Sequence, residues 1–146
     1  MEELLESYIS EEELHKFEQK YNDECRQHIT NPKTKFDYAW CLLKSKYRLN
    51  VCRGVILMEE LFRDGDETVR RDYIYYIAFG KCKLREYSDA QRYIKAFLEM
   101  EPANRQAREL HEVIVKRSRV DSLTGAAIVT SIAAFVLGVG IALLKH

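Results

Sequence analysis

The chain has 146 residues, a length typical of one domain. It carries 23 Lys and Arg residues against 23 Asp and Glu residues, so its formal net charge is zero. This balance argues against a nucleic-acid-binding protein, which usually carries a basic surplus. Only two prolines and six glycines are present and no stretch alternates with a period of two, so we predict an all-α protein.

The cysteines give no disulfide pattern. The four of them, Cys25, Cys41, Cys52 and Cys82, lie far apart in the sequence without a CxxC motif. Each falls within a helix-like pattern, so we predict buried or half-buried free thiols in a reducing compartment.

The chain begins with an acidic arm, residues 1–9, which combines two leucines and an isoleucine with three glutamates. Two interpretations remain open. The arm is either a short helix that competes for a groove of the protein, with its acids meeting Lys44 or Lys83, or it is a frayed terminus.

The first long helix is predicted from Ser10, which forms a capping box with Glu13. Its apolar stripe, at spacings of three and four, consists of Leu14, Phe17, Tyr21 and Cys25. The chain then breaks at Asn31-Pro32.

Four further helices follow, and we predict them over residues 34–48, 51–62, 68–84 and 88–101. Asn50 is the predicted cap of the second of these four, and Ser88 with Gln91 forms a capping box for the last. A sixth long helix begins near Asn104 and ends in a basic collar of Lys116, Arg117 and Arg119.

The middle four helices form two similar pairs. A shift of 36 residues places Trp40 on Tyr76 and Gly54 on Ala90, two small residues that let paired helices approach closely. A two-helix repeat of about 34 residues is typical of tetratricopeptide units. We therefore predict, over residues 10–120, a six-helix antiparallel bundle with two tetratricopeptide-like helix pairs plus capping helices.

A long apolar run closes the sequence. Residues 125–144 carry no charge, and a helix of this length spans about 30 Å, the thickness of the hydrocarbon layer. We predict a transmembrane tail anchor over residues 123–144 and a short basic tail over residues 145–146. The apolar residues of this anchor are Ala126, Ile128, Val129, Ile132, Phe135, Val136, Leu137, Ile141, Leu143 and Leu144, and its targeting flank is Lys145 and His146.

Three stretches carry a family resemblance: FDYAWCLLKSKY (36–47), RDYIYYIAFGKCKLREY (71–87) and EPANRQAREL (101–110). Together they resemble the mitochondrial fission 1 protein family, over nearly the whole chain. The resemblance implies a cytosolic bundle anchored in the mitochondrial outer membrane, and often in the peroxisomal membrane. It also implies binding to a dynamin-related GTPase or its adaptors, or to regulators of small GTPases, and promotion of organelle fission without enzymatic activity. Gly138-Val139-Gly140 offers a close-approach surface for another span, but the motif is too short to predict a dimer and lipid-facing glycines are the default, so a homo-oligomer is left open.

The resemblance also implies a partner-binding groove on the first helix of each pair. The matching residues are Tyr38, Leu42, Tyr76, Phe79 and Lys83, and we add Lys44 beside them. The spacings of three and four place each set on one helical face, opposite a packing face that includes Trp40. We expect Leu42→Ala or Tyr76→Ala to weaken partner binding without loss of the fold; the competing interpretation is that these aromatic residues are ordinary core.

Catalytic and metal-binding motifs are not found in the sequence. It has no phosphate-binding loop, His111-Glu112 lacks the second histidine of a zinc-protease motif, and Cys25 with His28 has no second ligand pair. We predict no enzyme, cofactor or metal. The alternative function is a tail-anchored cochaperone or import receptor that binds peptide termini, but this function needs an inward-facing Asn, Lys and Arg cluster, and the predicted groove is aromatic.

Overall fold

The computed structural model describes the backbone of residues 1–29 and 31–143 and the side chains of residues 1–29 and 31–124. The predicted anchor residues from Ala126 to His146 therefore lie outside the described side chains. Within the part of the chain that the structure describes, no helix combines the length and the apolar character that a membrane span requires.

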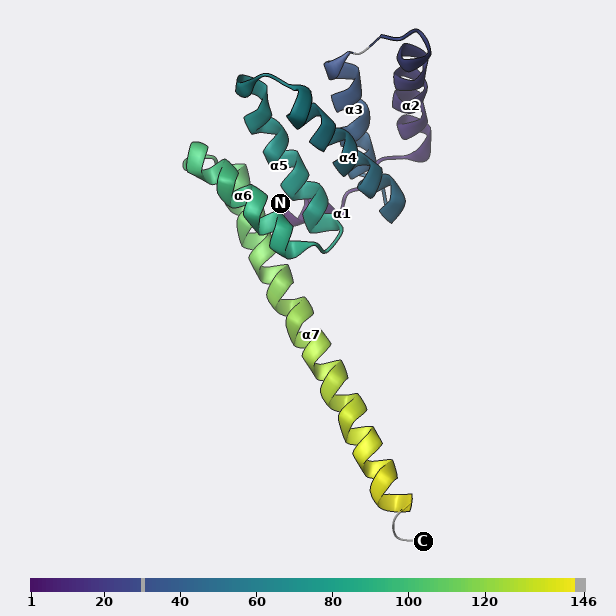
Figure 1. Ribbon diagram of the computed structural model, residues 1–146, viewed down its shortest axis with the longest axis vertical. Helices are drawn as coiled ribbons and strands as arrows, with labels where there is room; N and C mark the ends of the chain where they lie inside the picture. Colours follow the sequence, from purple (N-terminus) through teal and green to yellow (C-terminus); the bar gives the residue numbers. More distant parts are fainter. Residues whose placement is uncertain (30, 144–146) are drawn as a thin grey trace.

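The described chain is entirely helical, as predicted. In order its helices are α1 (Glu2–Glu6), α2 (Glu11–Arg26), α3 (Pro32–Leu43), α4 (Arg48–Asp64), α5 (Glu67–Lys83), α6 (Tyr87–Met100) and α7 (Arg105–Leu143). From α2 onward each helix packs against the next along the chain, and α3 also contacts α5. The helices form an antiparallel array from which α7 continues as one long helix (Figure 1).

Local capping explains several of the helix starts. The Ser10 hydroxyl accepts a hydrogen bond from the Glu13 amide at 3.1 Å, which confirms the predicted start of α2. The Asn104 side chain accepts from the Ala107 amide at 3.0 Å at the start of α7. Pro32 occupies the first turn of α3, where its missing N–H costs nothing.

Two predicted caps are wrong. Asn50 lies inside α4, which begins at Arg48, and its side chain donates to the Ser45 hydroxyl at 3.0 Å. The same hydroxyl accepts from the Tyr47 amide, so the turn closes earlier than the sequence pattern indicated and α3 ends at Leu43. Ser88 likewise lies inside α6, which begins at Tyr87 without a side-chain cap.

Two helices end with a residue in the left-handed region. His28 (φ 58°) follows α2 and Arg85 (φ 64°) follows α5. In both turns an amide reaches back five residues, from Ile29 to the Glu24 carbonyl at 2.9 Å and from Glu86 to the Lys81 carbonyl at 3.0 Å. These are Schellman motifs built without glycine.

The core is tightest where α3, α4 and α5 meet. A Cβ atom on Gly54 would lie 3.0 Å from the Ala39 carbonyl oxygen, and one on Gly80 would lie 2.5 Å from Val55 Cγ2. The close approach predicted at Gly54 is therefore confirmed. All four cysteines are free, and Cys41, Cys52 and Cys82 are buried or half-buried as predicted. The prediction is wrong for Cys25, which lies in the last turn of α2 and is exposed.

Candidate functional site: an aromatic row and an N-terminal arm

A row of aromatic rings fills the space between α3 and α5. Phe36 packs edge-on against Tyr76 at 4.9 Å between ring centroids and lies 6.0 Å from Tyr73. Trp40 packs against Tyr76 at 5.3 Å and against the buried Phe79 at 5.1 Å. We call Phe36, Trp40, Tyr73 and Tyr76 the aromatic row; all four are half-buried. Rings held this way offer rigid apolar area to a partner at little entropic cost.

Two lysines lie at one end of the aromatic row. Lys44 Nζ is 5.4 Å from the centre of the Trp40 ring, a cation–π distance. Lys83 Nζ donates to the Ser45 carbonyl at 3.2 Å and lies 4.9 Å from the centre of the Tyr8 ring. Burial lowers the pKa of Lys83 to about 8.

The six residues predicted to line the groove divide into two groups. Tyr76, Lys44 and Lys83 are half-buried, with part of each side chain accessible. Tyr38, Leu42 and Phe79 are core residues, 1%, 2% and 0% exposed. The expectation that Leu42→Ala leaves the fold intact does not fit so buried a side chain, because its truncation would leave a cavity.

Tyr38 contributes to the packing of α2 rather than to an open face. Its ring stacks on Tyr21 at 5.1 Å, and its hydroxyl donates to Glu18 at 3.0 Å. The side chain is 1% exposed, and burial raises its pKa to about 12. α2 covers this face of α3, so Tyr38 lies within an interface between the two helices.

Phe36 and Trp40 belong to the candidate site, although sequence reasoning assigned Trp40 to the packing face. The signal that could have identified them is the spacing of four between these two rings, matched by the spacing of three between Tyr73 and Tyr76. Both pairs lie on the faces where α3 and α5 approach each other.

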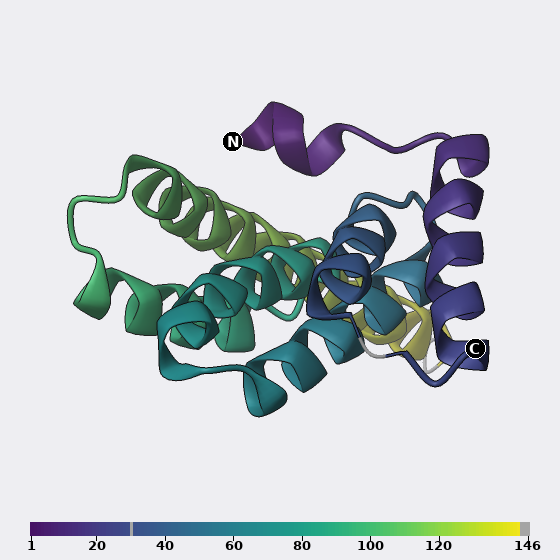
Figure 2. The same cartoon turned by 90° about the horizontal axis from the view of Figure 1, so that it is seen from above.

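The N-terminal arm, residues 1–9, is ordered and includes α1. It crosses the side of the bundle formed by α3, α5 and α7 (Figure 2). The Ile9 amide donates to the Lys44 carbonyl at 3.1 Å, and Leu5 is only 2% exposed. Of the two interpretations of the arm, the short helix is therefore correct and the frayed terminus is wrong.

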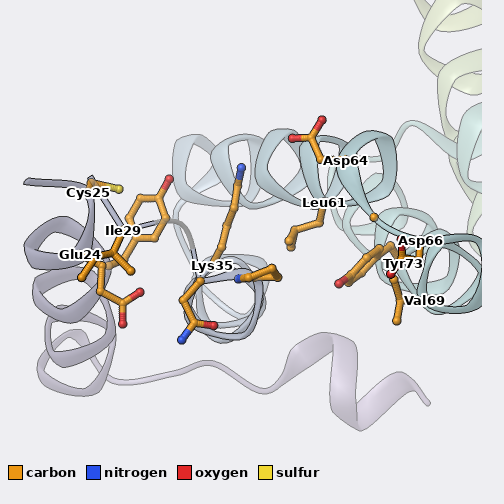
Figure 3. Close-up of a pocket in the computed structure, with 13 residues that line it drawn as sticks. Glu24, Cys25, Ile29, Lys35, Leu61, Asp64, Asp66, Val69 and Tyr73 are labelled. Carbon is orange, nitrogen blue, oxygen red and sulfur yellow. The ribbon is translucent and has the colours of Figure 1, made fainter. Parts of the chain in front are cut away.

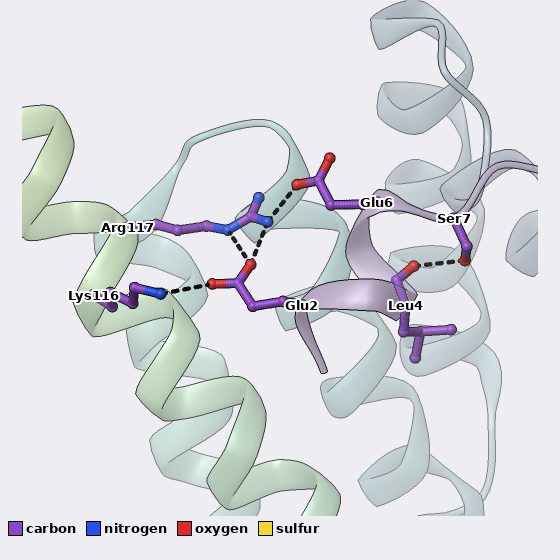
Figure 4. A network of polar contacts seen from close by, with 6 residues as sticks. All are labelled: Glu2, Leu4, Glu6, Ser7, Lys116 and Arg117. Atoms are coloured by element: carbon purple, nitrogen blue, oxygen red, sulfur yellow. Dashed lines mark hydrogen bonds and ion pairs between the residues drawn. The ribbon is translucent and has the colours of Figure 1, made fainter.

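Charged contacts hold the arm to α7 (Figure 4). Arg117 donates to Glu2 at 2.6 and 3.2 Å and to Glu6 at 2.5 Å, while Lys116 lies 3.6 Å from Glu2. The hydrogen bond from Arg117 lowers the pKa of Glu2. We call these four residues the arm latch. The acids of the arm thus meet α7 rather than the predicted Lys44 and Lys83.

Among the residues that the structure describes, no group of three or more His, Cys, Asp and Glu side chains is arranged to hold a metal ion. Two helix pairs with an aromatic row between their first helices define an interaction protein of the tetratricopeptide class.

Sequence comparison identifies the family. The protein-family model for the Fis1 N-terminal tetratricopeptide repeat matches residues 33–65, and the family model for the Fis1 C-terminal tetratricopeptide repeat matches residues 71–123. The mitochondrial fission 1 protein of Mus musculus is 41% identical over 138 residues, which cover 94% of this chain and 91% of that protein. The same protein of Candida albicans is 34% identical and covers 93% and 86%. The chain belongs to the mitochondrial fission 1 protein family, which confirms the resemblance and the prediction of a non-enzymatic adaptor protein.

Solved structures agree on the fold. Yeast Fis1 in complex with an Mdv1 fragment superimposes with a TM-score of 0.73 at 28% identity, covering 80% of this chain and 90% of that one. Yeast Fis1 with a Caf4 fragment gives a TM-score of 0.58 at 29% identity, covering 64% and 93%. The all-α tetratricopeptide-like prediction is confirmed.

Proposed function

We propose that this chain is a membrane-anchored receptor on the mitochondrial outer membrane that recruits the fission machinery through the aromatic row. The observation that carries the proposal is this row, because it lies between the first helices of the two repeats that match the Fis1 family. The solved complexes of yeast Fis1 with Mdv1 and Caf4 fragments support an adaptor as the direct partner. The specific partners that we propose are a dynamin-related GTPase, its adaptors and regulators of small GTPases.

In the proposed mechanism an amphipathic helix of the partner lies along the aromatic row and stacks its apolar face on the rings. Lys44 and Lys83 at the end of the row attract acidic groups of that helix. The docked arm occupies the same side of the bundle, so partner binding requires the arm to leave. Tyr8 and Ile9 of the arm directly contact the ends of α5 and α3, at Lys83 and Lys44.

The anchor belongs to the proposal as well. Residues 123–144 would span the outer membrane, with residues 145–146 on the far side and the bundle in the cytosol. The same anchor would serve the peroxisomal membrane. A homo-oligomer through the spans remains part of this proposal.

Imaging tests the anchor. We expect the full chain to coat mitochondria and fragment them in cells, and a copy without residues 123–146 to be diffuse and inert. Coating without fragmentation would retain the anchor but contradict the role in fission.

Pull-down from the same cells tests the groove. Tyr76→Ala in the full chain should reduce capture of the dynamin-related GTPase or its adaptor, because it removes the ring that contacts both Phe36 and Trp40. Tyr93→Ala, a half-buried tyrosine on α6 outside the row, is the matched control. Equal capture by the two variants would contradict the proposed groove.

A further inference from the structure

A cavity lies at the N-terminal ends of α3 and α5, away from the arm, and no residue of the arm lines it (Figure 3). Its volume is about 380 Å³, within the range of ligand pockets. The C-terminal end of α2, the N-terminal end of α3, the α4–α5 turn and the start of α5 surround it. This is enough room for one large side chain of a partner, but not for a helix.

The walls of the cavity are aromatic and aliphatic. Tyr21 and Tyr73 contribute rings, and Leu61 closes one side. Ile29 and Val69 are 47% and 40% exposed although each lines the cavity. The Schellman motif after α2 turns Ile29 toward the cavity, and it requires His28 to adopt a left-handed backbone conformation.

The rim of the cavity is negatively charged. Three carboxylates line it, from Glu24, Asp64 and Asp66, against one ammonium group, from Lys35. The Lys35 charge is already neutralised, because its Nζ lies 2.5 Å from Glu60.

The three carboxylates differ in their partners. Glu24 accepts a hydrogen bond from the Thr34 hydroxyl at 2.8 Å, and Asp64 pairs only with its exposed neighbour Arg63 at 3.1 Å. In the described part of the chain the Asp66 side chain has no hydrogen bond or ion pair, and it leaves the first turn of α5 uncapped. An apolar hollow with a carboxylate rim is complementary to an apolar group that carries a positive charge.

We propose that this cavity is a second binding site, which takes an aromatic side chain next to an arginine or lysine on a segment of a partner protein. The ring enters between Tyr21 and Tyr73, and the cation lies at the rim beside Asp64 and Asp66. The site is continuous with the aromatic row, since Tyr73 lines the cavity and lies 6.0 Å from Phe36. The proposed site is argued from the residues that line the cavity and from their charge, and it does not depend on a role of the chain in fission.

A matched pair of capped tetrapeptides tests the site. One has tryptophan next to arginine and the other has tryptophan next to glutamate; both are titrated into the methyl-labelled full chain in nanodiscs of zwitterionic lipid. We expect the arginine peptide to shift the methyl signals of Ile29, Leu61 and Val69 with a dissociation constant on the order of 1 mM. The buried methyl groups of Ile94 and Ile114 report on the intact fold.

Three variants separate charge from shape. Asp66→Asn should weaken the arginine peptide about 3-fold, as expected for an exposed ion pair, and should not weaken the glutamate peptide, from which it removes a repulsion. Glu99→Gln removes an exposed carboxylate of α6 and should alter neither titration. Val69→Phe should fill the mouth of the cavity and abolish the shifts of Ile29 and Leu61. Equal binding of the two peptides, or no shift of the three cavity methyl groups with either, would overturn the proposal.

Discussion

Removal of the Arg117 guanidinium should open the arm. In Arg117→Ala, Glu2 loses two hydrogen bonds and Glu6 loses one. Arg117 is 24% exposed and Glu2 is 42% exposed, so we take this charge-assisted pair as worth about 1.5 kcal/mol. Glu6 is 61% exposed, and its pair contributes only about 0.5 kcal/mol. The loss of about 2 kcal/mol corresponds to a shift of about 30-fold toward the open arm.

Hydrogen exchange at the Ile9 amide measures this shift directly, because that N–H donates to the Lys44 carbonyl only while the arm is docked. The exchange rate in the full chain should rise about 30-fold in Arg117→Ala. Affinity for the fission adaptor should rise in parallel, by no more than the same factor, if the closed arm blocks the aromatic row. Arg119→Ala, two residues further along α7 and exposed, is the control.

The latch would be refuted by an Ile9 amide that exchanges equally fast in Arg117→Ala, Arg119→Ala and the unaltered chain. A faster Ile9 amide without any gain in adaptor affinity would have a different meaning. It would retain the latch but show that the arm and the partner occupy different surfaces.

Three other predictions concern single residues. His28→Gly should stabilise the fold by about 1 kcal/mol in thermal unfolding, because glycine relieves the left-handed φ of 58°; an unchanged or lower midpoint would contradict this. Gly80→Ala should cost about 1–3 kcal/mol, because the new Cβ would lie 2.5 Å from Val55 Cγ2, and adding Val55→Ala should recover part of that loss in a double-mutant cycle. Lys83, whose pKa burial lowers to about 8 from an ordinary value of 10.5, favours the folded chain more as the neutral amine than as the ammonium. The free energy of unfolding should therefore rise between about pH 8 and 10 relative to that of Lys83→Met at the same pH; an equal pH dependence of the two chains would contradict this.

The helices and the repeat could be predicted because their signals are local. The stripe of Leu14, Phe17 and Tyr21 and the Ser10 cap lie within two or three turns of chain, and the structure places α2 accordingly. The caps at Asn50 and Ser88 failed for a physical reason. In the α3–α4 turn the Ser45 hydroxyl accepts hydrogen bonds from the Tyr47 amide and from the Asn50 side chain. Asn50 is therefore a donor to this turn and does not cap a helix.

The faces of α3 could not be assigned from its sequence. Tyr38 and Trp40 lie on two different apolar faces, and the period of the helix does not say which one α2 covers. The stacking of Tyr21 on Tyr38 decides this question, and that contact joins residues of different helices. The arm latch is less predictable still, since Arg117 and Glu2 are 115 residues apart. The cavity beside Asp66 had no sequence signal either, because the pattern around it is that of a solvated turn.

The chemistry of the arm also indicates what can replace it. The arm presents Leu5 to the bundle and carboxylates to Lys116 and Arg117. When the arm leaves, an apolar surface and two cations of α7 lose their partners together, and the ammonium of Lys83 loses the Tyr8 ring. A segment that displaces the arm must compensate both losses, because an apolar helix alone would leave the cations unneutralised and an acidic peptide alone would leave the rings uncovered. We therefore expect the partner of the aromatic row to combine leucine-like and acidic side chains, the reverse charge of the group that fits the cavity at the other end of α3 and α5. A single partner could then lie on the bundle in only one direction, with its acidic end toward Lys116 and Arg117 of α7.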